Sequence, residues 1–310
     1  MEKHEHEEHN HSKAHSHDVS EIKGVRLILV MLLNFLITAA EILGGIYSGS
    51  LSLVSDALHN FSDGLSIIIS YLAIKISGRQ NDIKRTFGYK RASIMAALLN
   101  SSVLIGISLF LFKEAYVKFI NPQPINGSMI IWVALISLVA NALGVILLEK
   151  GSHGDLNIKS TYIHLLSDVL SSIGVVVGGI LILFFKIYWV DPLLTVLISI
   201  YILKESLSIL KEAINILMQG TPENIDINKI AEDLKKIDGV SDIHHVHVWC
   251  LDENNINFET HLNLENDALV SRTSSIKESA EHILAEHYGI NHITIQFEYK
   301  CCNDMGIIKK

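Results

Sequence analysis

Two copies of one short motif carry the residues of this chain that could do chemistry. His59 and Asp63 are four residues apart, as are His164 and Asp168, and each pair forms the pattern H-x-x-S-D within an apolar segment. A spacing of four residues places both side chains on one face of an α-helix. At a rise of about 1.5 Å per residue, both pairs fall near the middle of a membrane core that is about 30 Å thick.

Two imidazoles and two carboxylates that converge there would form a four-ligand site suited to tetrahedral Zn²⁺. The apolar segments contain no cysteine, which disfavours Cu(I), and imidazole ligands disfavour Ca²⁺ and Mg²⁺. The alternative is a set of buried hydrogen bonds between helices, as we expect for Asn34, Asn100 and Asn141. Because the motif occurs twice, in segments of opposite direction, the pattern favours a metal site between inverted repeats.

Six apolar segments are long enough to hold these residues in a membrane. The 310 residues are 49% apolar and 19% charged, and the mean hydropathy of +0.34 is too high for two soluble domains. A spanning helix needs about 20 apolar residues. The predicted transmembrane helices cover residues 24–46, 51–76, 93–119, 126–148, 158–185 and 187–209.

The loop at 77–92 fixes the predicted orientation, because it holds five Lys and Arg residues and positive loops stay inside. An even number of spans then puts both termini in the cytoplasm. The sequence therefore predicts a multi-pass protein of the inner (plasma) membrane, with residues 21–212 as a six-helix transport domain embedded in the lipid bilayer.

Residues 213–300 predict a cytoplasmic α+β domain. Turn signals and periodicity give the element order αββαβ, which is ferredoxin-like. Alternation along the first strand places His245 and His247 on one face and His244 on the other. Residues 301–310 form a C-terminal tail.

The first 20 residues contain six histidines among acidic residues and no apolar run, which predicts a disordered cytoplasmic tail that can raise the local metal concentration. A net charge of −8 and a pI of about 6.0 exclude nucleic acid as a partner. The chain contains neither H-E-x-x-H nor a phosphate-binding loop, so we expect no enzyme activity and no ATP use.

The predicted spans contain further charged residues. Four of them lie near span ends, where we expect their side chains to reach the interface, namely Glu41, Lys113, Glu114 and Asp191. Asp56, three residues before His59, is either a further carboxylate at the site or a solvated residue near a helix start.

The chain resembles the cation diffusion facilitator family, specifically its bacterial branch that exports zinc, cadmium and cobalt. The likeness runs from about residue 20 to residue 300. It rests on the paired H-x-x-x-D motifs, FGYKR at 87–91, GSHGDLNIKSTYIHLLSD at 151–168, HHVHVW at 244–249 and HITIQFE at 292–298. The resemblance implies a homodimer of six-helix subunits that exchanges cytoplasmic Zn²⁺ for protons.

The resemblance assigns the transport site to the same four residues of the two motifs, and the imidazole of His59 is similar to the zinc-preferring pattern. Some family members also bind metal through Asp and His in the loop after the second span. This chain departs from that pattern, because it has no histidine between residues 59 and 153 and only Asp82 could serve.

The resemblance further assigns a regulatory zinc site in the cytoplasmic domain to His244, His261 and Glu298. Three more residues are candidates to complete its coordination shell, namely His292, Cys301 and Cys302.

The sequence thus predicts an exporter of divalent transition metals, in the first place a Zn²⁺/H⁺ antiporter that also accepts Cd²⁺ or Co²⁺ and works by alternating access. Metal requires neutral imidazole and ionised carboxylate, so protons compete with Zn²⁺ for the same side chains. The alternatives are a passive metal channel and a membrane metal sensor that signals to a partner.

Overall fold

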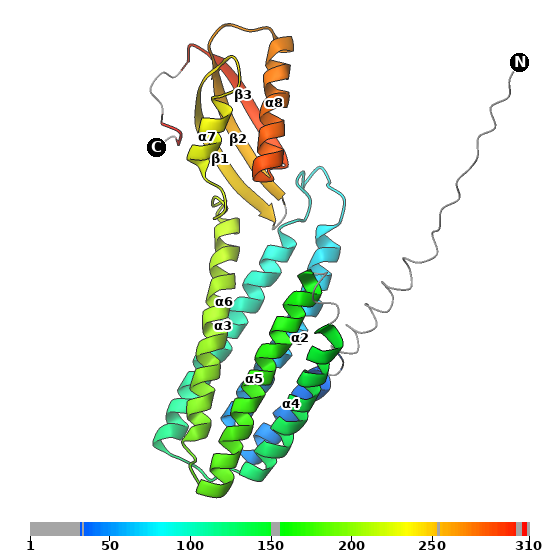
Figure 1. The fold of residues 1–310 in the computed structure, drawn as a ribbon, viewed down its shortest axis with the longest axis vertical. Coiled ribbons are helices and arrows are strands. Elements are labelled where there is room, and N and C mark those ends of the chain that lie inside the picture. Colours follow the sequence, from blue (N-terminus) through cyan, green and yellow to red (C-terminus); the bar gives the residue numbers. More distant parts are fainter. Residues whose placement is uncertain (1–31, 33, 150–155, 253–254, 302–305, 309–310) are drawn as a thin grey trace, which may run out of the picture. The chain divides into compact units, whose positions relative to one another are not determined.

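A computed structural model gives the fold of the chain (Figure 1). It describes residues 32, 34–149, 156–252, 255–301 and 306–308. The predicted histidine-rich tail at 1–20 lies outside the described residues, as does most of the predicted tail at 301–310. The chain forms two compact units, one of residues 1–65 and 104–203 and the other of residues 66–103 and 204–310.

Long helices make up the first two thirds of the chain, as the apolar segments predicted. The part of the first span that the structure describes is helical from 34 to 48. The following helices are α2 (Leu51–Ser77), α3 (Ala92–Ile120), α4 (Gly127–Glu149), α5 (Leu156–Phe185) and α6 (Val190–Leu217). The ends of α2 to α5 lie within two residues of the predicted bounds.

Helix α6 continues eight residues beyond its predicted end at 209. No Gly or Pro lies between residue 209 and Gly220, and the buried residues Ala213 and Ile216 pack against Ile94 of α3. Packing of this amphipathic turn therefore extends the helix beyond its apolar part.

Among the described residues, four helices are long and apolar enough to cross a membrane: α3, α4 up to Ile146, α5 from Leu165, and α6. Large apolar side chains such as Leu36, Trp132 and Phe184 are exposed on the helix surfaces, where a soluble protein would carry polar residues. These features confirm a helical membrane domain. Helix α2 is more polar than these four because it contains His59, Asp63 and several serines.

A buried carboxylate joins the starts of α2 and α6. Asp191 lies in the first turn of α6 and is 0% exposed. Its oxygens accept hydrogen bonds from the backbone N–H of Leu51 (2.8 Å) and Ser52 (3.1 Å), and from the hydroxyls of Ser50 and Ser52. The side chain thus satisfies the free amides of the α2 N-terminus from another helix. The expectation that Asp191 reaches the membrane interface is wrong.

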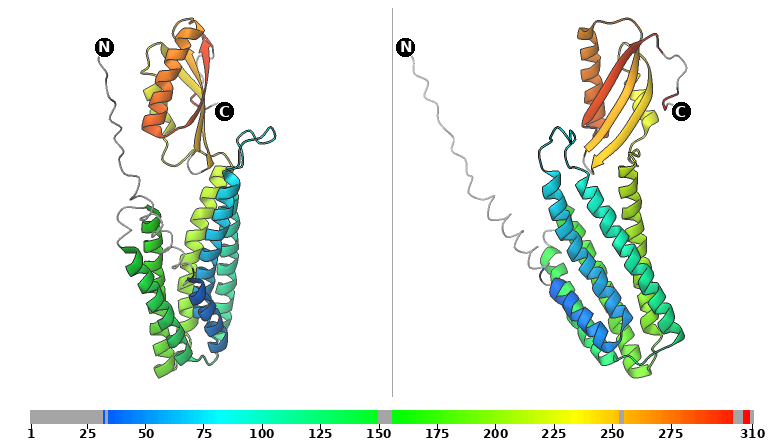
Figure 2. Two further views of the ribbon diagram at one scale, coloured as in Figure 1. Left: turned by 90° about the vertical axis from the view of Figure 1, so that its right-hand side faces the viewer. Right: turned by 180° about the vertical axis from the view of Figure 1, so that it is seen from behind.

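The C-terminal part has the predicted element order αββαβ. Its elements are α7 (Ile227–Leu234), β1 (Val240–Asp252), β2 (Asn255–Leu264), α8 (Val270–Tyr288) and β3 (His292–Tyr299). The sheet order is β1-β2-β3, with β1 and β2 antiparallel and β2 and β3 parallel (Figure 2). A parallel pair needs a crossover connection, which α8 provides.

Both helices of this domain cover one face of the sheet. Ile230 and Leu234 of α7 and Leu284 of α8 are fully buried against the sheet residues Phe258 and Leu262. Gly289 ends α8 with a φ of 66°, a left-handed conformation that glycine adopts without strain. The opposite face of the sheet is left to polar side chains.

We expect the Asp191→Ala variant to lower the thermal unfolding midpoint of the purified protein. Loss of an N-cap costs about 1 kcal/mol, and here the donors that lose their acceptor are buried. The matched control is Asn126→Ala, because Asn126 caps α4 from an exposed position through the backbone N–H of Met129. A smaller shift for Asp191→Ala than for the control would contradict the role given to Asp191.

Candidate metal sites

The first motif lies on one face of α2, as its spacing predicted. His59 is buried, and its Nδ1 lies 3.5 Å from Oδ2 of Asp63. The contact joins residues i and i+4, so one helical turn is enough to bring the two side chains together.

The second motif lies on α5. Asp168 is 4% exposed, and it lines a cavity of about 360 Å³ together with His59. His164 lies on the same helix one turn earlier, but its side chain is outside those that the structure describes. The structure therefore brings one residue of each motif copy to a common cavity.

Serine and aromatic side chains complete the polar part of this cavity. Ser167 and Ser171 of α5 line it, and so does Tyr201 of α6. The rings of Tyr201 and His59 meet edge to face, with their centroids 6.1 Å apart. Sequence reasoning missed Tyr201, because nothing in the apolar run of α6 distinguishes it; Ser171 had a signal, since it lies three residues after Asp168.

Two more carboxylates are buried in the helices next to this cavity. Asp56 is 3% exposed and accepts a hydrogen bond of 2.6 Å from the hydroxyl of Ser171. Glu41 is 1% exposed and accepts a hydrogen bond of 3.0 Å from the side-chain amide of Asn60. Neither the solvated position considered for Asp56 nor the interfacial position expected for Glu41 is correct.

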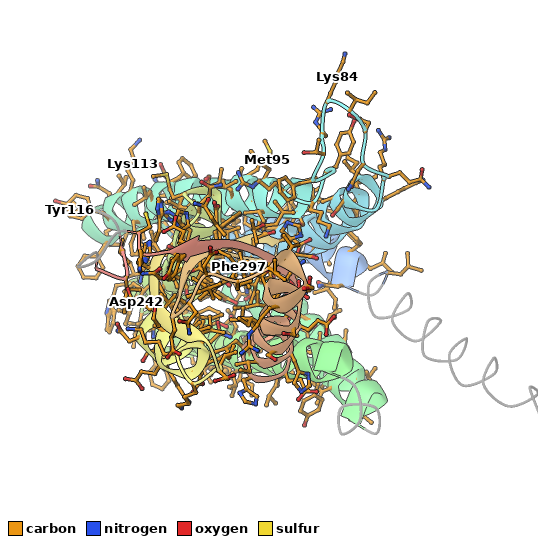
Figure 3. All side chains as sticks on the ribbon, turned by 90° about the horizontal axis from the view of Figure 1, so that it is seen from above. Lys84, Met95, Lys113, Tyr116, Asp242 and Phe297 are labelled. Atoms are coloured by element: carbon orange, nitrogen blue, oxygen red, sulfur yellow. The ribbon has the colours of Figure 1, made fainter. Side chains whose placement is uncertain are left out.

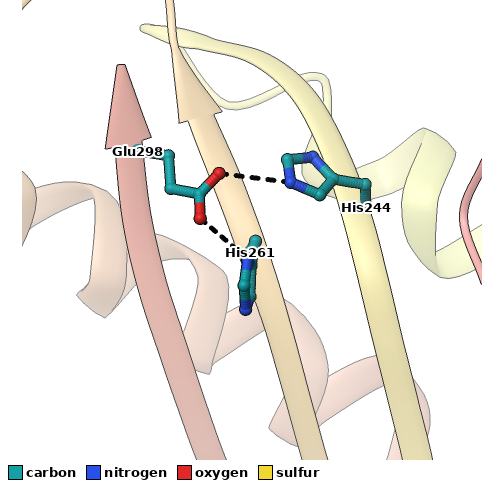
Figure 4. Close-up of side chains that lie close together, drawn as sticks. All are labelled: His244, His261 and Glu298. Atoms are coloured by element: carbon teal, nitrogen blue, oxygen red, sulfur yellow. Dashed lines mark ion pairs between the residues drawn. The ribbon is translucent and has the colours of Figure 1, made fainter. Parts of the chain in front are cut away.

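A second cluster lies on the polar face of the C-terminal sheet. His244 of β1, His261 of β2 and Glu298 of β3 each offer a ligand atom, and these atoms lie within 4.8 Å of one another (Figure 4). Oε1 of Glu298 lies 2.8 Å from Nδ1 of His261, and Oε2 lies 3.2 Å from Nε2 of His244. The strand register produces this arrangement, because His244 and His261 are direct cross-strand partners.

The charge of Glu298 is set by its neighbours. Burial acts to raise the pKa of this carboxyl, but hydrogen bonds from Cys301 and Gln296 and the adjacent imidazoles outweigh it. The pKa of Glu298 therefore lies below its ordinary value, and the group is an anion at neutral pH. An anionic oxygen beside two imidazoles is a donor set that suits Zn²⁺.

The first strand does not alternate regularly at this site. The register shifts between His244 and His247, and His245 has a φ of 57°. This β-bulge turns the ring of His245 toward His261, at a centroid distance of 4.5 Å. The expectation that alternation separates His245 from the face of His244 is therefore wrong.

The additional candidate ligands differ in their positions. His292 begins β3, six residues before Glu298 and thus about 20 Å along the strand, and its ring meets Phe87 at 5.9 Å. His292 is therefore not part of the cluster, contrary to our prediction. The thiol of Cys301 contacts Glu298, whereas Cys302 lies outside the described residues.

Comparisons with known proteins agree with these observations. The family model described as cation efflux transmembrane domain matches residues 27–218, and the model described as cation efflux protein, cytoplasmic domain, matches residues 222–300.

Three curated relatives match most of the chain. A protein of Bacillus subtilis named cadmium, cobalt and zinc/H(+)-K(+) antiporter is 35% identical over 93% of both chains. The metal cation efflux system protein CzcD of Cupriavidus metallidurans is 33% identical, over 93% of this chain and 90% of its own length. The zinc transporter ZitB of Escherichia coli is 32% identical, over 95% and 94%. The chain therefore belongs to the cation efflux family, whose members are transporters and not enzymes.

Proposed function

We propose that the protein exports Zn²⁺ from the cytoplasm in exchange for protons, by alternating access. The observation that carries this proposal is the cavity that His59 and Asp168 share, because it joins the two copies of the motif inside the helix bundle. Asp63 and His164 are the proposed third and fourth ligands. The printed names of the relatives, which include zinc, cadmium, cobalt and H⁺, support the same ion class.

Proton exchange follows from the chemistry of the proposed ligands. Zn²⁺ binds imidazole only when it is neutral and carboxylate only when it is ionised. Protons and Zn²⁺ therefore compete for the same side chains, so a site open to a more acidic exterior releases metal and takes up protons. A passive channel is less well supported, since a small polar region between apolar residues is not a continuous pore.

We also propose that His244, His261 and Glu298 hold a regulatory Zn²⁺. Nε2 of His244 and Oε2 of Glu298 are buried and face each other at 3.2 Å, and Nδ1 of His244 is buried and makes no hydrogen bond within the described residues. Such atoms are costly unless something binds them. A bound Zn²⁺ would cross-link the three strands β1, β2 and β3.

The match to the cytoplasmic-domain model supports the proposal that the protein dimerises through this domain.

The proposed location is the plasma membrane, with both termini in the cytoplasm. The basic loop between α2 and α3 supports this orientation, because cationic loops remain on the cytoplasmic side.

We expect Asp168→Asn to reduce Zn²⁺ uptake into inside-out vesicles with an imposed pH gradient by about tenfold or more. The neutral amide leaves the ion without one of four ligands. The matched control is Ser172→Ala, because Ser172 is a buried residue of α5 that contacts Ser137 and not the cavity. Uptake at the wild-type rate by Asp168→Asn would contradict the proposed site.

His59→Asp should broaden ion selectivity. Replacing imidazole with a third carboxylate makes the ligand set harder and less demanding in geometry. The measurement is vesicle uptake of Zn²⁺, Cd²⁺ and Mn²⁺ compared within one preparation, and we expect the ratio of Mn²⁺ or Cd²⁺ to Zn²⁺ to rise. An unchanged ratio would show that the imidazole does not determine selectivity.

Zn²⁺ should raise the thermal unfolding midpoint of the purified protein at pH 7.5 through the cytoplasmic site. We expect His244→Ala/His261→Ala to lose most of this shift and His282→Ala, at an exposed position on α8, to keep it. The shift should shrink at pH 5.5, because protons compete with Zn²⁺ for its ligand atoms, while the lowered pKa of Glu298 keeps this carboxylate available. A full shift in the double variant would refute the site.

A further inference from the structure

The loop between α2 and α3 carries a concentration of positive charge that metal transport does not use. Residues 78–91 contain one carboxylate, and the cations of this loop are Arg79, Lys84, Arg85, Lys90 and Arg91. The loop belongs to one compact unit together with the end of α2, the start of α3 and the C-terminal domain.

The single carboxylate of the loop is already engaged in holding its shape. Oδ1 of Asp82 accepts hydrogen bonds from the backbone N–H of Lys84 (2.7 Å) and Arg85 (2.8 Å), which lowers the pKa of Asp82. The hydroxyl of Tyr89 donates to Oδ2 at 3.3 Å, and the Arg85 guanidinium lies 4.5 Å from the centre of the Tyr89 ring. The loop is therefore held in its fold by its own side chains.

The folded loop forms one wall of a cavity of about 570 Å³. Four cations line this cavity, namely Lys84, Arg85, Lys90 and Arg91, and none of its described lining residues is a carboxylate. Its other walls include Met95 of α3 and Trp249 of β1. The cavity is thus positively charged on one side and apolar on another.

Two of these cations have no anionic partner among the residues that the structure describes. Nε of Arg91 is buried and makes no hydrogen bond within the described residues. Nζ of Lys90 donates to the neutral side chain of Asn255 at 2.7 Å. Because a partly buried cation is costly without a counter-charge, this geometry favours a bound anion, and guanidinium groups match phosphate oxygens particularly well.

The apolar side of the cavity identifies the source of the phosphate. Met95 is 62% exposed, and the exposed residues Leu99 and Val103 follow it on α3 at intervals of four residues. This spacing makes one continuous apolar stripe. Figure 3 shows Lys84 at the outermost part of the loop and Met95 on the outer side of α3. A phosphate with an acyl chain attached fits this combination, whereas free phosphate would leave the stripe unused.

We propose that this cavity binds the phosphate of an anionic phospholipid of the cytoplasmic leaflet, with an acyl chain along Met95, Leu99 and Val103. The loop joins the ends of two membrane helices, which is the level of the headgroups, and anionic lipids attract cations there. The proposal depends on the cytoplasmic position of the loop proposed above and not on which ion is transported.

The test is native mass spectrometry of the delipidated full-length protein, titrated with phosphatidylglycerol and with phosphatidylcholine of the same acyl chains. We expect phosphatidylglycerol to bind more tightly, and Lys90→Gln/Arg91→Gln to weaken it by roughly tenfold or more, at about 1 kcal/mol for each cation near the surface. The matched control is Lys113→Gln/Lys186→Gln, two exposed cations outside the cavity, and it should bind as wild type. Lys84→Gln should also weaken binding, and it should fold as wild type because Lys84 is exposed.

Equal binding of the two lipids, or unchanged binding by the loop variants, would overturn the proposal. Displacement of phosphatidylglycerol by millimolar inorganic phosphate would instead assign the cavity to a soluble anion and overturn the proposal that it binds a lipid. Zn²⁺ uptake is measured separately on the same variants. Because mass spectrometry detects lipid binding without any transport, a failure of the lipid proposal is distinguishable from a failure of the proposed transport function.

Discussion

Polar groups inside an apolar helix bundle must find partners on neighbouring helices, and this constraint organises the membrane part around α2. The amides at the start of α2 are bound by Asp191 of α6. Further along, Asp56 meets Ser171 of α5, and Asn60 meets Glu41 of the first helix. Each of these contacts fixes α2 against a different neighbour, and His59 is thereby held beside Asp168 in their common cavity. Polar pairing therefore positions the proposed transport site.

The cytoplasmic cluster depends on strand register instead. His244 faces His261 only in the observed pairing of β1 with β2, and Glu298 follows because β3 runs parallel to β2. A slip of one residue would move His261 to the helix-covered face and destroy the cluster. The bulge at His245 has a cost, since a left-handed conformation is unfavourable for a residue with a side chain. Its position beside the cluster is typical of bulges that direct side chains at a functional site.

Sequence reasoning recovered whatever depends on local periodicity. The bounds of α2 to α5, the αββαβ order and the pairing of His59 with Asp63 follow from local residue patterns, whereas α6 continues eight residues beyond its predicted end. It failed where the partner lies on another element, as with Asp191. The residues around Asp191 in the sequence do not indicate whether its side chain faces the membrane interface or the start of α2. The prediction for His292 was wrong for a related reason. His292 lies on the same strand as Glu298, and only its distance along β3 keeps it out of the cluster.

The shared carboxylate at the starts of α2 and α6 also limits how the bundle can move. Three hydrogen bonds from the first turn of α2 and one from Ser50, just before it, end on a single side chain of α6, so sliding of the two helices at this end would break them. A movement of α2 against α6 that keeps these hydrogen bonds would have to pivot at this end. The joined starts of α2 and α6 are thus the fixed point of such a movement. The cavity that His59 and Tyr201 line lies further along both helices, away from this fixed point.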